Sequence, residues 1–382
     1  MSDQILAEKP AARPAILFYL LLVGVAAAAW CGVHLNSAGA LLLAASLVLL
    51  APLARAPQRS SVLVSLSMVL LGLALADWFT PFVFPPGPQT IFRTYASGYR
   101  SGVTEVGVLP SPGAYRSERH AADGTVIYDV TYTVGPDQLR VTPDNPAGPH
   151  RVNFFGCSFT YGEGLRDDET LPYYFSQAIR TAHVMNFGYH GRGANNALAL
   201  LESNWDTTGD INFFLGAGFQ VERGVCHPDW TVHSPRYELL PDGSLKRNGA
   251  CGEPRGLSDR LLTSAYRYSN ILAKVDNFLR SHISDDDVRL YLATLRRMAS
   301  LSHARGQKFV VGYINDPNSQ VGETSYPNNR IMKEIASFAD DLIDMALPPD
   351  PRNNIGGDGH PSGYANQKRA AILAGHLAKY LP

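Results

Sequence analysis

Apolar residues dominate the first 84 positions, and no Lys, Arg, Asp or Glu lies between Arg13 and Arg55. A helix needs about 20 apolar residues to cross the hydrocarbon core of a bilayer. One short apolar run would be typical of a cleaved signal peptide, but several runs in series are not. We therefore predict an N-terminal membrane anchor of about three transmembrane helices, at 15–35, 38–53 and 60–76.

The basic residues around these runs predict their orientation. Lys9 and Arg13 precede the first run, and Arg55 and Arg59 separate the second from the third. Loops rich in Lys and Arg stay in the cytoplasm. With three spans, everything after about residue 85 lies outside the cytoplasm, in a multi-pass protein of the inner (cytoplasmic) membrane with a periplasmic domain. With two spans, that domain would face the cytoplasm.

A Pro-rich linker and a small β-rich lead-in are expected in residues 85–150, where Thr125–Val134 alternates like a strand. From residue 151 to 382, short apolar runs alternate with helical stretches, which predicts a parallel sheet covered by helices on both faces. Residues 221–260 look like an irregular insertion. The expected strands are Val152–Phe155, His183–Phe187, Ile211–Leu215, Lys308–Ile314 and Asp341–Met345, and the expected helices are Leu171–Thr181, Ala194–Ser203, Asp286–Ala304 and Gln367–Leu381.

Charge and cysteine content narrow the class of protein. The net charge is −1, so nothing in the composition favours nucleic acid as a partner. Cys226 and Cys251 flank a polar segment rich in Pro and Gly, which a disulfide could hold together in an oxidising compartment. The alternative is two unrelated thiols.

A candidate nucleophile follows the first predicted strand of the sheet. Ser158 lies in a turn of small residues, Gly156 to Gly164, before a helix. At the end of such a strand a serine is exposed at the sheet edge, and its own N–H can stabilise an oxyanion. The alternative is a serine in an ordinary strand-to-helix turn.

A candidate base lies near the C-terminus, where Asp358 and His360 share a glycine-rich loop before the last helix. A serine hydroxyl is a poor nucleophile at neutral pH and needs a base beside it. A histidine can be that base when a carboxylate holds its tautomer. Together with Ser158, this loop indicates nucleophilic catalysis by a serine.

These two motifs, in this order, resemble those of the SGNH (GDSL-type) hydrolase superfamily. Gly-Cys-Ser-Phe-Thr at 156–160 is similar to its first block, with Cys157 in place of Asp, and Asp-Gly-His-Pro-Ser at 358–362 is similar to its last. The resemblance covers about residues 150–382. It implies a flavodoxin-like three-layer α/β/α domain that acts on esters or acyl groups without a metal or cofactor.

The middle blocks of the superfamily match less evenly. By resemblance, Gly191 supplies a second oxyanion N–H, but Gly218 occupies the position where the family has an Asn donor. Asn195 and Gln220 are the candidates to replace that donor. His190 and Arg192, which flank Gly191, are further candidates for substrate contact. Alternatively, His190 could be structural and Arg192 could be a solvated surface charge.

The function that these observations predict is a membrane-anchored serine esterase or acyltransferase. The resemblance and the predicted topology favour O-acetyl groups of cell-envelope or exported polysaccharide as the substrate. Partners would then be the lipid bilayer, an acylated carbohydrate or another ester, and polysaccharide export or modification proteins. The alternatives are an esterase for lipids or small esters, and a polysaccharide-binding or assembly scaffold whose catalysis has decayed.

Overall fold

The computed structural model describes residues 57–84, 91–93, 99, 102–257, 259–260, 270–271, 274–275, 278, 282–316 and 318–381. The chain forms two compact units. One consists of residues 1–87 and 254–279, and the other of residues 88–253 and 280–382. The predicted lead-in and catalytic domain therefore belong to one unit, except that residues 85–87 and 254–279 fall in the unit that contains the N-terminus.

In the first unit, helix α3 (Pro57–Val83) covers the third predicted transmembrane run. Among the described residues, no helix has both the length and the apolar character that crossing a membrane requires. The predicted span at 60–76 therefore gains no support from α3. The other two predicted spans, at 15–35 and 38–53, lie outside the described residues.

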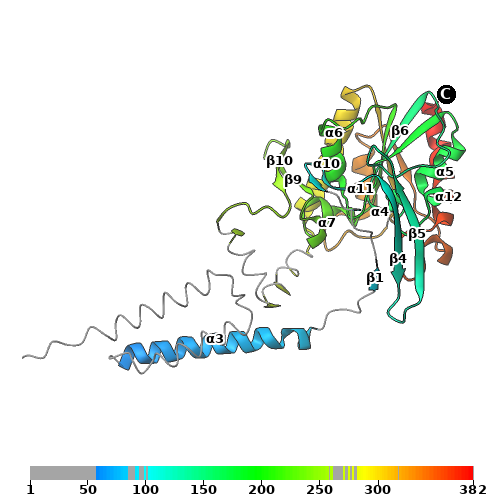
Figure 1. Cartoon of the computed structure of the whole chain (residues 1–382). Coiled ribbons are helices and arrows are strands. Elements are labelled where there is room, and N and C mark those ends of the chain that lie inside the picture. The colour runs from blue at the N-terminus through cyan, green and yellow to red at the C-terminus, as the bar shows by residue number, and fades with distance from the viewer. Residues whose placement is uncertain are drawn as a thin grey trace, which may run out of the picture. The chain divides into compact units, whose positions relative to one another are not determined.

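A five-stranded parallel sheet forms the centre of the second unit (Figure 1), as the sequence predicts. Its order is β12-β11-β8-β6-β7. The strands are β6 (His150–Phe155), β7 (Ala182–Asn186), β8 (Ile211–Gly216), β11 (Lys308–Tyr313) and β12 (Asp341–Asp344). All six residues of the central strand β8 are buried, because helices cover both faces of a parallel sheet.

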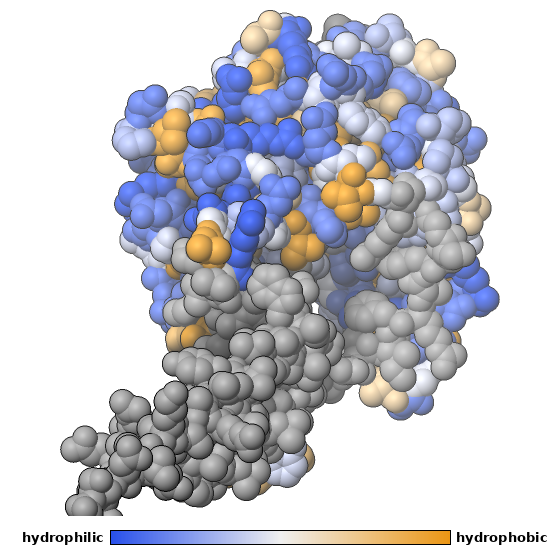
Figure 2. Space-filling view, turned by 60° about the vertical axis from the view of Figure 1, so that its left-hand side comes forward, coloured by the Kyte–Doolittle hydropathy of each residue, from blue (hydrophilic) through white to orange (hydrophobic). Residues whose placement is uncertain are grey.

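Helices cover the two faces of this sheet. On one face, α5 (Leu171–Ala178) and α12 (Gly363–Leu377) pack together and share a core with the sheet. The other face is covered by α6 (Ala194–Glu202), α10 (Asp285–Ala304) and α11 (Asn328–Ile335). The predicted three-layer α/β/α architecture is therefore confirmed for this unit. Figure 2 shows that hydrophobic residues are scattered over one largely hydrophilic face of the described surface.

The lead-in forms a long antiparallel hairpin of β4 (Gly113–His120) and β5 (Val126–Val134), joined at one edge by β1 (Ile91–Arg93). A second, short hairpin pairs β2 (Gly102–Thr104) with β3 (Gly107–Leu109). Arg140 makes isolated bridges with both Val134 and Asn186. The lead-in is thereby connected to β7, the edge strand of the parallel sheet.

Residues 221–260, predicted to be irregular, contain several short regular elements. Helix α7 (Gln220–Gly224) opens this stretch, a short 3₁₀ turn η3 (Asp229–Thr231) follows, and β9 (Pro235–Leu239) pairs with β10 (Leu245–Ala250). The many Gly and Pro residues lie mainly between these short elements. Three more 3₁₀ turns are η2 (Asp167–Glu169), η4 (Pro351–Asn353) and η5 (Ala378–Tyr380).

Candidate active site

Ser158 is the first residue of the four-residue helix α4 (Ser158–Tyr161), three positions after β6 ends. The chain turns here at Gly156 and Cys157, and Ser158 is only 3% exposed. Among the described residues, no acceptor for the Ser158 backbone N–H is found. The residue therefore presents both a hydroxyl and a free N–H at the carboxyl edge of the sheet.

His360 and Asp358 lie in the loop between η4 and α12, and the structure brings them to Ser158. Nε2 of His360 is 2.9 Å from Oγ of Ser158, and its Nδ1 is 2.5 Å from Oδ2 of Asp358. The same Asp358 oxygen accepts a hydrogen bond from the His360 backbone N–H at 3.3 Å. A serine, a histidine and a carboxylate thus form one continuous chain of hydrogen bonds, the arrangement that activates a serine nucleophile.

A second carboxylate, Glu163, lies beside this chain. Its Oε2 atom is 2.7 Å from Nδ1 of His190 and 3.4 Å from Nε2 of His360. Burial raises the pKa of Glu163, but the charge and hydrogen bond of His190 and the charges of His360 and Arg119 outweigh it and hold the pKa at about 2. Glu163 is therefore ionised at any working pH.

Opposing effects act on the pKa of His360. Burial lowers it, the carboxylate of Glu163 raises it, and the cations of Arg119 and Arg223 lower it further, with a net shift below the ordinary value. A lowered pKa keeps the imidazole neutral near pH 7. A neutral imidazole can accept a proton, as a general base must.

Arg119 of the lead-in forms an ion pair with Oδ1 of Asp358. The Asp358 side chain is fully buried, and that of Arg119 is nearly so. A buried carboxylate requires such a partner, because an unpaired buried charge is costly. The sequence did not suggest Arg119 as a site residue, because it lies in the mostly polar strand β4.

The lead-in also holds the loop that follows Ser158. The Arg140 guanidinium donates to the carbonyls of Tyr161, Gly162 and Leu165, and its Nε donates to Asp167 at 3.0 Å. The predicted β-rich segment therefore contributes to the site, since it fixes the backbone within and just after the Ser158–Glu163 turn.

A pocket of about 480 Å³ opens beside the hydrogen-bonded chain. Gly191, the predicted second oxyanion donor, lines it with φ at +69°, and no acceptor for its N–H is found among the described residues. A Cβ there would lie 2.9 Å from Cδ1 of Trp230. Both the positive φ and this close contact therefore favour glycine at the position. The pocket lining is Val108, Arg119, Ser158, Glu163, Tyr189, His190, Gly191, Arg192, Asn196, Arg223, Trp230, His233, Ser234, Asp358 and His360.

The two candidates for the missing amide donor do not line this pocket. Nδ2 of Asn195 donates to the carbonyl of Pro235 at 2.7 Å, and Nε2 of Gln220 donates to that of Leu215 at 3.0 Å. Both side chains are buried, so their donors serve the backbone of the fold. The prediction that Asn195 or Gln220 replaces the family's Asn is therefore wrong. Gly218 itself donates its N–H to Asn315 at 2.7 Å.

Arg223 of α7, the helix that follows β8, also lines the pocket. Its Nη1 donates to the carbonyl of Arg192 at 3.3 Å, and its guanidinium lies 4.8 Å from the ring centre of Phe219. Phe159 packs against both Phe219 and His360, at centroid distances of 5.3 Å each. A cation thus lines the same pocket as Ser158, and the sequence pattern did not single it out.

His190 and Arg192, the candidates for substrate contact, both line the pocket but differ in their roles. Nε2 of His190 lies 2.7 Å from the hydroxyl of Tyr99, and Nδ1 is the nitrogen that contacts Glu163, so both ring nitrogens are occupied. Arg192 is buried and donates to the carbonyls of Phe187 and Val108 at 3.2 Å each. Burial lowers its pKa to about 10. Arg192 is therefore not the surface charge that one interpretation of the sequence expected.

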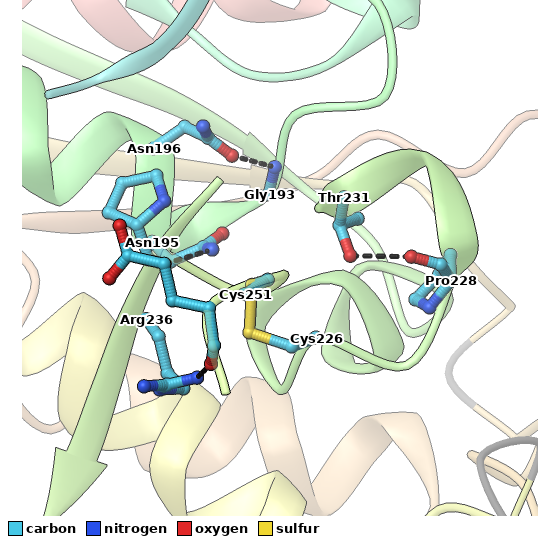
Figure 3. The surroundings of a disulfide bond; sticks show 10 residues. Gly193, Asn195, Asn196, Cys226, Pro228, Thr231, Arg236 and Cys251 are labelled. Atoms are coloured by element: carbon cyan, nitrogen blue, oxygen red, sulfur yellow. Dashed lines mark hydrogen bonds between the residues drawn. A yellow bond between two sulfur atoms is a disulfide. The ribbon is translucent and has the colours of Figure 1, made fainter. Parts of the chain in front are cut away.

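Cys226 and Cys251 form a disulfide bond, with their Cα atoms 5.2 Å apart. Figure 3 shows the bond beside the start of α6 at Gly193, Asn195 and Asn196. The bond ties the segment after α7 to the end of β10. Among the described residues, no group of three or more His, Cys, Asp or Glu side chains could hold a metal ion.

No protein-family model and no curated protein matches this chain. Solved structures with a similar fold include the acetyl xylan esterase Est2A from the rumen bacterium Butyrivibrio proteoclasticus, with a TM-score of 0.36, 13% identity and coverage of 62% of this chain and 65% of that chain. A member of the lipolytic G-D-S-L family from Veillonella parvula has a TM-score of 0.35, 12% identity and coverage of 60% and 98%. AlinE4, an SGNH-hydrolase family esterase, has a TM-score of 0.32, 15% identity and coverage of 61% and 97%.

Proposed function

We propose that this chain is a serine ester hydrolase or acyltransferase, with Ser158 as the nucleophile, His360 as the base and Asp358 as the residue that orients the base. The observation that carries this proposal is the chain of hydrogen bonds from Ser158 Oγ through both nitrogens of His360 to Asp358. It ends at a pocket large enough for a small substrate.

The reaction proceeds in two halves. Nε2 of His360 takes the Ser158 proton while Oγ bonds to the ester carbon, and the negative charge moves to the carbonyl oxygen. That oxygen then reforms the carbonyl, the ester C–O bond breaks, and His360 returns the proton to the departing alcohol. In the second half a water or a sugar hydroxyl attacks the acyl-enzyme in the same way. Water gives a hydrolase, and a sugar hydroxyl gives a transferase.

Two backbone groups and one cation are positioned to stabilise the oxyanion. The N–H groups of Ser158 and Gly191 are free to donate, and Arg223 lines the same pocket. We infer that Arg223 supplies the hydrogen-bond donor that the Asn side chain provides elsewhere in the superfamily, because α7 follows β8 where that Asn is expected. One such donor contributes about 10²–10³ to the rate.

We infer further that the ester is an O-acetyl group on carbohydrate outside the cytoplasm. The disulfide between Cys226 and Cys251 supports an oxidising compartment. The apolar runs at 15–35 and 38–53, with basic residues before and after them, support anchoring in the inner membrane. Accessibility of a C-terminal tag in intact cells tests the compartment, and a tag that reacts only after the inner membrane is permeabilised would contradict it.

Release of acetate tests the reaction itself. We expect the full chain to release acetate from partially acetylated xylotetraose, and Ser158→Ala to lose this activity while keeping its circular dichroism spectrum. Addition of unacetylated xylotetraose as acceptor separates the two reaction types, because a transferase moves the acetyl group to it. A folded wild-type chain that releases no acetate from this oligosaccharide and none from phenyl acetate would contradict the proposal.

A further inference from the structure

We propose that the segment closed by the Cys226–Cys251 disulfide forms a sugar-binding subsite at the pocket, in which the indole of Trp230 stacks on a pyranose ring. We call it the stapled segment. The inference rests on the proposed function and deepens it, because it assigns the substrate class to particular residues outside the Ser158–His360–Asp358 chain.

Trp230 is unusually exposed for so large an apolar side chain. It lies in η3 and is 64% exposed, yet it lines the same pocket as Ser158. Its Cδ1 atom is the nearest neighbour that a Cβ on Gly191 would meet, at 2.9 Å. A ring this exposed gains little hydrophobic stabilisation from the fold, and Trp is enriched among the side chains that anchor bound partners. Here the ring lies next to the predicted oxyanion donor, where the alcohol part of an ester would extend.

A disulfide and hydrogen bonds to α6 fix the backbone of the stapled segment, which carries Trp230. The disulfide closes a stretch with a sequence separation of 25, and the β9–β10 hairpin fills much of it. The hydroxyl of Tyr237 on β9 donates to Glu202 of α6 at 2.7 Å, and Asn195 donates to the Pro235 carbonyl. A platform that is already ordered loses little entropy when a ligand binds.

Within η3 itself, Thr231 is buried and its hydroxyl donates to the Pro228 carbonyl at 2.6 Å, as Figure 3 shows. The turn that bears Trp230 is therefore anchored by the residue next to it. Trp230 therefore lies on a turn that is held in place, while its own side chain is 64% exposed.

The side chains near Trp230 can hydrogen-bond to the hydroxyl groups at the edge of a sugar ring. His233 and Ser234 from the stapled segment, and Arg223 before it, line the pocket with groups that hydrogen-bond to hydroxyls. A pyranose ring has an apolar C–H face and a polar edge, and the electron-rich face of an indole attracts polarised C–H groups. A simple alkyl or aryl ester lacks this combination. The subsite therefore favours a glycosyl ester over a small ester.

A ratio of activities tests the subsite separately from the chemistry. For each variant we would measure kcat/KM on partially acetylated xylotetraose and divide it by kcat/KM on phenyl acetate, which has no sugar ring. We expect Trp230→Ala to lower this ratio by about 10-fold or more, the loss typical of an aromatic anchor, and Trp230→Phe to recover part of it. Val126→Ala, at an exposed position of β5 outside both the pocket and the stapled segment, is the control and should keep the wild-type ratio.

A measurement of oligosaccharide binding tests the subsite even if catalysis is slow. In a Ser158→Ala background, calorimetry with xylotetraose should give a Kd that rises about 10-fold when Trp230→Ala is added. Loss of the disulfide in Cys226→Ser/Cys251→Ser should also weaken this binding.

The two proposals fail in different ways. If Ser158-dependent hydrolysis of phenyl acetate persists and Trp230→Ala changes neither the ratio nor the Kd, the subsite is wrong and the esterase proposal stands. If neither ester is hydrolysed by the folded wild-type chain, the proposed function fails.

Discussion

Oε2 of Glu163 lies 3.4 Å from Nε2 of His360, the same imidazole nitrogen that contacts the Ser158 hydroxyl. A negative charge at this distance stabilises the imidazolium that forms when His360 takes the proton from Ser158. Glu163 itself remains ionised because its pKa is about 2. The base is therefore flanked by two carboxylates, Asp358 on Nδ1 and Glu163 near Nε2.

Substituting Glu163→Gln should change the pH dependence in a defined direction. The wild-type carboxylate raises the pKa of His360. Its removal lowers that pKa, so the acid limb of kcat/KM, which reports neutral His360, should move to lower pH. The rate on the plateau should fall by about 10-fold, because the imidazolium loses a stabilising charge. A pH profile on phenyl acetate measures both effects.

Asp168→Asn is the matched control for this substitution, since Asp168 lies on an exposed part of η2 and pairs with Arg166 at the surface. Its pH profile should coincide with that of the wild type. An acid limb of Glu163→Gln that moves to higher pH would show that Glu163 does not act on His360 in this way.

Removing Arg119 should cost both stability and activity. Arg119→Met leaves the buried carboxylate of Asp358 without its ion-pair partner, and breaking a buried pair costs about 3 kcal/mol or more. Urea unfolding should report this loss, and kcat should fall by about 10-fold or more because Asp358 no longer holds His360 in place. Asp358→Asn combined with Arg119→Met should regain stability without regaining activity.

Arg116→Met is the control for Arg119, because Arg116 lies on the same strand but pairs with Asp129 at the exposed surface. Exposed pairs contribute about 1 kcal/mol or less. Equal destabilisation by the two substitutions would contradict a special role for Arg119.

Arg223 should matter for the chemical step more than for binding. If its guanidinium faces the oxyanion, Arg223→Gln should lower kcat on phenyl acetate by about 10²-fold and change KM much less. Arg223→Lys should recover part of the rate, since it keeps the charge but loses the planar donor geometry. Lys246→Gln on β10 is the surface control. A large rise in KM at unchanged kcat would instead assign Arg223 to substrate binding.

The strands of the sheet could be predicted from the sequence within about two residues at each end. Each is a short apolar run between polar turns, and β8 is buried along its whole length, so its pattern has few alternatives. The hairpin strand β4 was missed because its sequence, Gly-Ala-Tyr-Arg-Ser-Glu-Arg-His, is mostly polar. The role of β4 in the site depends on the ion pair of Arg119 with Asp358, which lies more than 200 positions away in the sequence.

The candidate site could be predicted in part. Ser158, Asp358 and His360 lie in motifs whose order and chemistry are visible along the chain, and the structure brings them together. The replacement for the family's Asn could not be found by position, because Asn195 and Gln220 use their amides to satisfy buried backbone carbonyls. Which polar group faces a pocket depends on packing, which a single sequence does not show.

Covalent labelling of Ser158 tests the central claim most directly. The folded full chain should react with a fluorophosphonate probe, and mass spectrometry should place the adduct on Ser158. The adduct should be absent in Ser158→Ala, form far more slowly in His360→Ala, and form normally in the control variant Val126→Ala. A folded wild-type chain that gives no Ser158 adduct would contradict the account.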